Sequence, residues 1–372
     1  MSPQAHGSGT AAPSAIGSAS LVDDPADAEL TTVLDHGIVD RPSATLFLTT
    51  DGESVIFSGT SERDAPTDHA PDLLTARPGE APRVIFTNPR RQSDLIPVAA
   101  GGGYVAFGEG NVAEFGEKAW VLWLLPPGAS EPIELDRNPA TNDAPLPLVA
   151  LNERHVVWQA IGFGPVLERA ELVALDLPSM TRRVLRTADP QEYQWWDPAL
   201  DGDRLVYTEV DYVHGDAASQ FQPAELYAML LDLGDPTAAP VRLDTSGRAT
   251  EPDIHDGTVV WKEADNVFAW GTLVVHDLSS GRSRMVATDP QSGIKSPSLG
   301  NRYVGFWGID DTRFYLYDLK RDEMARVFTI APTSEIGGAF RIEVAGDLAV
   351  WVQGAEGEPA LAWARLPTMN DP

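Results

Sequence analysis

Cysteine is absent from this 372-residue sequence, which excludes disulfide bonds, thiolate metal sites and cysteine nucleophiles. No apolar run approaches the roughly eighteen residues that a membrane-spanning helix needs. Basic residues are scarce, with 27 lysines and arginines against 55 acidic residues and a net charge of -28. Because such a charge repels phosphates, the composition excludes a general affinity for nucleic acid or anionic membrane surfaces. We therefore expect no nucleic-acid partner and no direct membrane insertion.

Local motifs for catalysis and cofactor binding are also missing. The sequence has no Gly-x-Ser-x-Gly elbow, no Walker A loop and no Gly-x-Gly-x-x-Gly after a strand. Its seven histidines show neither His-x-His nor His-x-x-x-His spacing, so no zinc site is encoded locally. Gly101, Gly102 and Gly103 precede a predicted strand and not a helix, so they indicate a turn and not a phosphate cradle. We expect no catalytic residues, no metal-binding residues and no cofactor.

The N-terminal segment has the composition of an unfolded chain. Residues 1–20 are mostly small, proline or polar, and they bury too little apolar surface to offset the entropy of ordering. They lack the basic and apolar regions of a signal peptide. We predict that residues 1–28 form a disordered tether, of the kind that follows a removed export signal or lipid anchor. This predicts an extracytoplasmic protein (secreted, periplasmic or lipid-tethered); the alternative is the frayed terminus of a cytoplasmic protein.

One short segment recurs along the rest of the chain. A turn rich in Gly, Asp or Asn precedes a pair of mostly apolar or β-branched residues that ends in an aromatic residue. Such turn residues tolerate the left-handed conformations of tight hairpins. The steps between successive aromatic residues run from 45 to 54 residues and average 49. These aromatic residues are Phe57, Phe107, Trp158, Tyr207, Trp261, Phe306 and Trp351.

Two further apolar runs follow each aromatic residue. The first often closes in Asp-Leu, as in Leu172–Leu177 and Phe314–Leu319, and the second is a short run such as Arg183–Thr187. Each unit therefore supplies a leading strand, the aromatic strand, the Asp-Leu strand and an outer strand. Four short antiparallel strands in a repeat of this length indicate one blade of a β-propeller.

The repeat count predicts the number of blades. Residues 29–372 hold seven units of the average length and form a single predicted domain. The last unit, Arg341–Leu366, contains only three of its strands. Leu30–Gly37 resembles the missing outer strand, which we predict at Thr31–Asp35. Pairing the two would close the ring and cover two exposed strand edges. We predict an all-β, seven-bladed β-propeller of four-stranded antiparallel blades, closed by an N-terminal strand; six blades are the alternative.

The repeat resembles the TolB-like and WD40-like β-propeller superfamily. The resemblance is carried by Asp197–Tyr207, which reads DPALDGDRLVY, and by Tyr315–Leu319, which reads YLYDL. It spans nearly the whole predicted domain and implies the propeller fold, whereas members of the superfamily include binding platforms, scaffolds and accessory domains of peptidases. TolB itself has six blades and an additional α/β domain, and neither is visible here. The Trp-Asp and Gly-His pairs of WD40 repeats are missing, apart from Trp196-Asp197.

The loops at one face of the predicted propeller suggest a binding site. Loops between the second and third strands of a blade share a face with the loops that join blades, at the mouth of the central channel. In the third to fifth blades these loops carry aromatic residues beside carboxylates. Exposed aromatic residues of this kind stack on a sugar ring or clamp an apolar peptide side chain. The alternative, which we favour for any single tryptophan, is a wedge packed between blades. The candidate ligand-binding residues are Trp195, Trp196, Asp211, Tyr212, His214, Glu263, Phe268 and Trp270.

Carboxylates also gather just past the aromatic strand. Acidic residues at these strand ends could form a ring at the channel mouth that attracts Ca²⁺ or a cationic partner. The alternative, which we favour, is solvated loop charge in a strongly acidic protein. The residues concerned are Glu109, Glu209, Glu263, Asp211, Asp310 and Asp311.

These observations predict a non-catalytic, monomeric binding platform outside the cytoplasm, with a protein, peptide or glycan ligand on one propeller face. The alternative is a propeller enzyme, such as a glycoside hydrolase or polysaccharide lyase, whose acids converge on the central channel from different blades and so leave no local motif. A third possibility is a structural role in subunit assembly. A screen for polysaccharide turnover distinguishes the enzyme from the platform.

Overall fold

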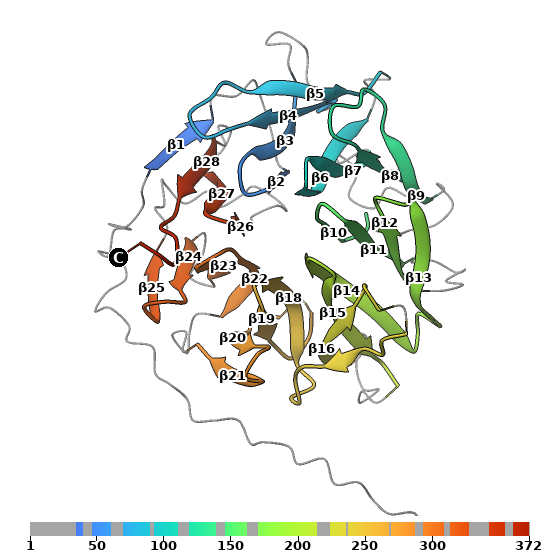
Figure 1. Ribbon diagram of the computed structural model, residues 1–372, viewed down its shortest axis with the longest axis vertical. Coiled ribbons are helices and arrows are strands. Elements are labelled where there is room, and N and C mark those ends of the chain that lie inside the picture. Colours follow the sequence, from blue (N-terminus) through green and yellow to red (C-terminus); the bar gives the residue numbers. More distant parts are fainter. Residues whose placement is uncertain are drawn as a thin grey trace, which may run out of the picture.

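The computed structural model describes residues 35–39, 47–60, 70–89, 93–110, 119–138, 146–161, 170–213, 224–235, 237–267, 269–286, 293–308, 313–326, 342–353 and 360–371. They form seven four-stranded antiparallel sheets arranged in a ring (Figure 1). Every secondary-structure element assigned in these ranges is a β-strand. The described part of the chain holds no helix with the length and hydropathy needed to span a bilayer. The predicted seven-bladed propeller is confirmed, and the predicted tether of residues 1–28 lies outside the described residues.

The first four blades each use four consecutive strands. Blade 1 consists of β2 (Leu48–Thr50), β3 (Val55–Gly59), β4 (Asp72–Ala76) and β5 (Arg83–Thr87). Blade 2 consists of β6 (Asp94–Gly101), β7 (Tyr104–Gly110), β8 (Trp120–Leu125) and β9 (Ile133–Asn138). Blade 3 consists of β10 (Val149–Leu151), β11 (His155–Ile161), β12 (Ala170–Asp176) and β13 (Thr181–Ala188). Blade 4 consists of β14 (Tyr193–Asp201), β15 (Arg204–Asp211), β16 (Glu225–Asp232) and β17 (Val241–Arg242).

The last three blades complete the ring. Blade 5 consists of β18 (Ala249–His255), β19 (Thr258–Glu263), β20 (Thr272–Asp277) and β21 (Arg282–Met285). Blade 6 consists of β22 (Ile294–Leu299), β23 (Tyr303–Gly308), β24 (Arg313–Asp318) and β25 (Glu323–Arg326). Blade 7 consists of β26 (Ile342–Ala345), β27 (Leu348–Gln353), β28 (Ala360–Arg365) and, as its outer strand, β1 (Asp35–Val39).

The N-terminal strand closes the ring as predicted, but at a later position. β1 pairs antiparallel with β28, from Asp35 opposite Arg365 to Val39 opposite Leu361. The expected strand, Thr31–Asp35, is therefore corrected to Asp35–Val39, and its first four residues lie outside the described ranges. The shift has a packing reason: Val39 is 4% exposed and joins the buried cluster between blades 7 and 1.

The core is divided among the interfaces between blades. Seven buried clusters each combine residues of two adjacent blades, and each contains one of the seven repeat aromatic residues. All seven lie in the second strand of their blade and are at most 5% exposed. A large side chain on every second strand thus fills the wedge-shaped space against the preceding blade, since burial of apolar area drives this packing. The predicted equivalence of these positions is confirmed.

The innermost strands of blades 4 to 6 share an irregularity beside the channel. Asp197, Glu251 and Ser296 adopt left-handed φ angles of 49°, 53° and 48°, and a proline follows each. The strand pairing shifts register at all three places. Proline has no N–H for the ladder, so the strand continues through a bulge. The bulged residues line the central cavity as a result.

A buried histidine behind the core predicts a pH dependence of stability. His276 of β20 packs against the ring of Trp261 at 5.7 Å, and one of its ring nitrogens lies 2.8 Å from the hydroxyl of Ser283. Burial lowers the pKa of His276 below its ordinary 6.5, with the charge of Asp277 opposing the effect. The unfolded chain then binds the proton more readily than the folded one. The contribution of neutral His276 to the free energy of unfolding is therefore fully present above about pH 6.5 and is lost as the pH drops through the folded pKa.

We expect His276→Gln to reduce the loss of unfolding free energy between about pH 7.5 and about pH 5.5, because the variant has no imidazole to protonate on unfolding. The measurement is urea unfolding at both pH values, with His255→Gln at the edge of the channel as the matched control. An equal pH dependence of wild type and His276→Gln would contradict the assignment.

Candidate functional site

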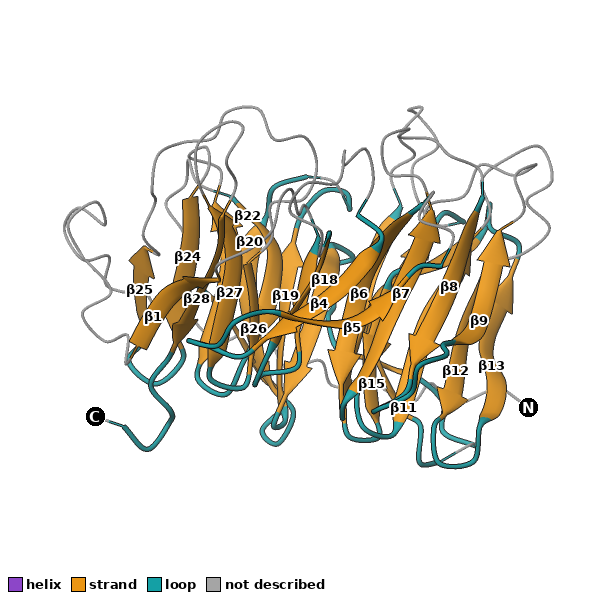
Figure 2. Cartoon of the chain, turned by 90° about the horizontal axis from the view of Figure 1, so that it is seen from above, coloured by secondary structure: helices purple, strands orange, loops and turns teal. Residues whose placement is uncertain are grey.

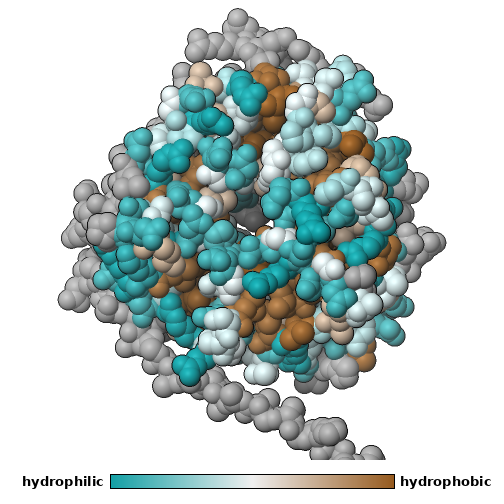
Figure 3. Space-filling view, viewed as in Figure 1, coloured by the Kyte–Doolittle hydropathy of each residue, from teal (hydrophilic) through white to brown (hydrophobic). Residues whose placement is uncertain are grey.

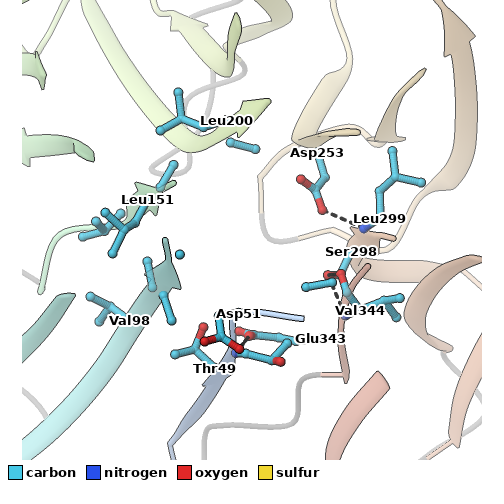
Figure 4. A pocket seen from close by; sticks show the side chains of 18 of the residues that line it. Thr49, Asp51, Val98, Leu151, Leu200, Asp253, Ser298, Leu299, Glu343 and Val344 are labelled. Carbon is cyan, nitrogen blue, oxygen red and sulfur yellow. Dashed lines mark hydrogen bonds between the residues drawn. The ribbon is translucent and has the colours of Figure 1, made fainter. Parts of the chain in front are cut away.

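A cavity of about 1240 Å³ runs along the centre of the ring, and residues from the innermost strand of every blade line it. The face seen in Figure 3 is hollowed at its centre. Aliphatic side chains of Val98, Leu151 and Leu200 form one side of the cavity in Figure 4. The opposite side presents Asp253 and Glu343 among further aliphatic residues. The wall therefore combines aliphatic side chains with several acidic ones.

The two ends of the cavity belong to different kinds of loop. In each blade, the turns that join the first strand to the second and the third strand to the fourth lie on one side of the disc, along one edge in Figure 2. We call this side the turn face. The loop face carries the other connections. Asp51, Glu153 and Asp347 line the cavity from turns of the turn face. Lys295, where β22 begins, and Trp307, near the end of β23, line it towards the loop face.

The carboxylates in the wall are used to fix neighbouring blades. Asp253 of blade 5 accepts the backbone N–H of Leu299 of blade 6 at 2.6 Å. Glu343 of blade 7 accepts the backbone N–H of Thr50 of blade 1 at 3.1 Å. Charge-assisted hydrogen bonds of this kind are stronger than neutral ones. These acids therefore hold the ring together and are already engaged as acceptors.

A third wall carboxylate, Glu251, lies in a buried network. One of its oxygens is 2.6 Å from the ammonium of Lys262, and the other accepts the backbone N–H of Ser296 at 2.6 Å. Lys262 is fully buried and also donates to the carbonyl of Val267 at 3.0 Å. A buried charge requires such a partner, since an unpaired one is strongly unfavourable. The network fixes β22 against blade 5.

Trp270, a predicted site residue, does not itself line the cavity in the described part of the chain, but it contacts two residues that do, Lys295 and Trp307. The backbone of Gly271 exchanges two hydrogen bonds with Ile294 of β22, at 3.2 and 2.8 Å, so the end of a blade 5 loop adds to blade 6. A Cβ at Gly293 would lie 2.4 Å from the Cβ of Trp270, which explains why this close approach needs glycine. We call Trp270, Lys295 and Trp307 the indole corner.

The indole corner combines two aromatic rings and a cation. The rings of Trp270 and Trp307 meet edge to face, with centroids 5.0 Å apart and an interplanar angle of 67°. The ammonium of Lys295 lies 4.8 Å from the Trp270 ring centroid. All three residues are half-buried. Partly exposed indoles beside a cation provide apolar contact area together with a charge for an anionic group.

The two tryptophans predicted in a loop of blade 4 lie instead in strand β14. Trp195 is 3% exposed, belongs to the cluster between blades 3 and 4, and donates its indole N–H to Glu209 at 3.2 Å. Trp196 is half-buried and donates to the side chain of Gln194 at 3.0 Å. The expected loop placement is therefore corrected, because the strand continues through the bulge at Asp197. Trp195 packs as a wedge between blades.

The other predicted site residues are placed around the loop face without joining the indole corner. Asp211 is buried at the end of β15 and accepts the backbone N–H of Val213 at 2.9 Å. Burial raises the pKa of Tyr212. Glu263 is half-buried at the end of β19. None of these three lines the cavity in the described part of the chain. His214 and Phe268 lie outside the described residues.

The acidic ring expected as a possible Ca²⁺ site is not assembled in the described ranges. Glu109 accepts hydrogen bonds from Asn88 and Ser93, in the connection between blades 1 and 2, and from Trp123 of its own blade, at 2.9 to 3.0 Å. Glu209 accepts the indole N–H described above. Within the described ranges, no group of three or more His, Asp or Glu residues could hold a metal ion. Asp310 and Asp311 lie outside these ranges.

Sequence reasoning missed Lys295 and Trp307. Trp307 directly follows the repeat aromatic residue Phe306, so on a strand it must point to the opposite side. Lys295 stands two residues before a proline of an innermost strand. Both signals are weak, because neither position recurs as the same residue type in other blades.

Comparison with known proteins supports the fold. No family model matches the sequence, and no curated protein sequence matches it. Among solved structures, the β-propeller domain of the Trilobed protease from Pyrococcus furiosus is similar, with 14% identity, a TM-score of 0.54 and coverage of 88% of this chain and 97% of that one. A puromycin-hydrolyzing peptidase of Mycobacterium tuberculosis matches with 15% identity and a TM-score of 0.54, covering 97% of this chain and 58% of the peptidase. TolB from Acinetobacter baumannii matches with 11% identity and a TM-score of 0.47, covering 77% of this chain and 66% of TolB. At these identities the likeness shows the fold alone, and the predicted β-propeller fold is confirmed.

Proposed function

We propose that this protein is a non-catalytic, extracytoplasmic binding platform, acting as a monomer, that holds a protein, peptide or glycan ligand at the loop-face end of its central cavity. The observation that carries the proposal is the indole corner. Two half-buried tryptophans are fixed by backbone pairing between two blades, at the end of a cavity of about 1240 Å³. Aromatic anchors in such positions supply much of the energy of a binding interface.

The hydrogen bonds of three channel carboxylates support binding over hydrolysis. A glycoside hydrolase needs two carboxyl groups flanking the scissile bond, one of them free to donate a proton and the other free to attack or activate water. Asp253, Glu343 and Glu251 instead accept backbone N–H groups of the next blade. Turnover of a polysaccharide that disappears when these acids are changed to amides would overturn the proposal.

We expect Trp270→Ala to weaken binding at least about thirtyfold, the equivalent of an anchor worth about 2 kcal/mol. Its indole packs on two residues of the cavity lining, and truncation leaves the backbone pairing of Gly271 intact. Trp196 is the other anchor that the sequence suggests. Trp196→Ala should weaken binding less than Trp270→Ala does, because the indole N–H of Trp196 already donates to Gln194.

The measurement is affinity, by fluorescence anisotropy, for a ligand selected from peptide and glycan libraries, together with a melting curve for each variant. If both variants fold and keep full affinity, the ligand binds elsewhere. If Trp270→Ala unfolds the protein, Gly293→Ala provides the second test, since it displaces Trp270 while retaining its ring.

A further inference from the structure

Within the described ranges, the ammonium of Lys295, a cavity-lining residue, has no carboxylate partner. In the part of the chain that the structure describes, the side chain of Lys295 makes a cation–π contact with Trp270 and takes part in no hydrogen bond or ion pair. Among the described residues that line the cavity it is the sole lysine or arginine. Half-burial restricts its hydration, so an anionic group that reached it would gain a charge-assisted hydrogen bond.

One wall carboxylate, Glu251, is paired with another cation. One carboxylate oxygen of Glu251 contacts the buried ammonium of Lys262 and the other accepts the backbone N–H of Ser296, each at 2.6 Å. Ser296 is the neighbour of Lys295 in sequence. The fully buried Lys262 therefore neutralises the charge of Glu251. Among the described residues, the unpaired charge at the indole corner is positive, although the protein as a whole is strongly negative.

We infer that the indole corner binds the C-terminal carboxylate of a peptide chain. Lys295 pairs with the carboxylate, and Trp270 and Trp307 contact an apolar or aromatic side chain at the end of the peptide. This inference rests on the proposed function and narrows its ligand from protein, peptide or glycan to one chemical group at one chain end.

The charge distribution of the cavity favours a chain end over an acidic polymer. Asp253, Glu343 and Asp51 line the same cavity as Lys295. A polyuronate carries a negative charge on every sugar, so it would bring further negative charges into a cavity that these acids line, and like charges repel. A peptide C-terminus carries one carboxylate only. Neutral or basic residues before it would suit the acidic wall.

The test begins with selection of random hexapeptides displayed with free carboxyl ends against the full-length protein. The enriched sequence is then synthesised as the free acid and as the amide, and a glucuronic acid hexamer serves as the polyuronate probe. We expect the amide to bind roughly ten- to a hundredfold more weakly than the acid, the range for loss of a hydrogen bond to a charged group.

Variants at Lys295 test whether this residue binds the carboxylate. Lys295→Met keeps the aliphatic stem and should weaken binding of the acid by the same factor while leaving the amide unchanged. Lys295→Arg keeps the charge and should retain most of the preference. Lys320→Met is the matched control, because Lys320 is exposed at a turn-face loop and its removal changes the net charge equally.

Failure of this inference differs from failure of the proposed function. If acid and amide bind equally and Trp270→Ala still weakens both, the carboxylate assignment is overturned and the platform stands. If the glucuronic acid hexamer binds in a Lys295-dependent way and no peptide is enriched, the ligand is an acidic glycan and not a chain end. If neither Trp270→Ala nor Lys295→Met changes binding of any selected ligand, both proposals are overturned.

Discussion

A truncation that removes residues 1–40 is expected to lower the melting temperature by several degrees or to make the protein aggregate. The deletion removes β1, and with it the five paired positions along β28. It also uncovers the cluster in which Val39 packs with Leu361 and Trp363. The backbone of β28 would then form an unprotected strand edge, which is a template for pairing with another chain.

The matched control for this truncation is removal of residues 1–20, which have no apolar pattern to bury. We expect its melting curve to follow that of the full chain closely. Thermal unfolding monitored by tryptophan fluorescence, with light scattering for aggregation, measures both variants. Equal stability of the two truncations would mean that ring closure does not depend on β1.

The fold was predictable because its repeat rests on one physical requirement. Each blade must fill a wedge against the preceding blade, and a large aromatic residue on the second strand does this in every repeat. A requirement that recurs every 45 to 54 residues is visible in the sequence. The closing strand was predicted four residues early, since it occurs once and its pairing with β28 is set by the burial of Val39.

The site was less predictable, because its geometry depends on contacts that occur once. Trp195 and Trp196 precede Asp-Pro, which are turn residues, so a loop was the natural prediction. The strand passes through that position by means of a bulge, and Trp195 enters the core. The indole corner depends on pairing between Gly271 and Ile294, which belong to different blades. No local pattern reports such a contact.

We expect a second large loss of stability when the repeat aromatic residue of blade 5, Trp261, is replaced. Trp261 is 3% exposed and packs in the cluster formed by blades 4 and 5, with Val206 and Ala228 on the other side of the interface. Trp261→Ala should lower the free energy of unfolding by about 3–5 kcal/mol, the range for removing a large aromatic side chain from a core. The loss combines the transfer free energy of the ring with the cavity left between two sheets.

Trp261→Phe distinguishes the ring from its polar atom. The indole nitrogen of Trp261 is buried without a hydrogen-bond partner in the described part of the chain, so phenylalanine removes that unfavourable burial while it retains much of the apolar area. We expect Trp261→Phe to lose less than half of what Trp261→Ala loses in urea unfolding at neutral pH. The m-value should stay unchanged in both, since the same surface is exposed on unfolding. A neutral effect of Trp261→Ala would contradict the interface packing on which the seven-blade repeat is built, because a cavity of that size between two blades cannot form without a loss of stability.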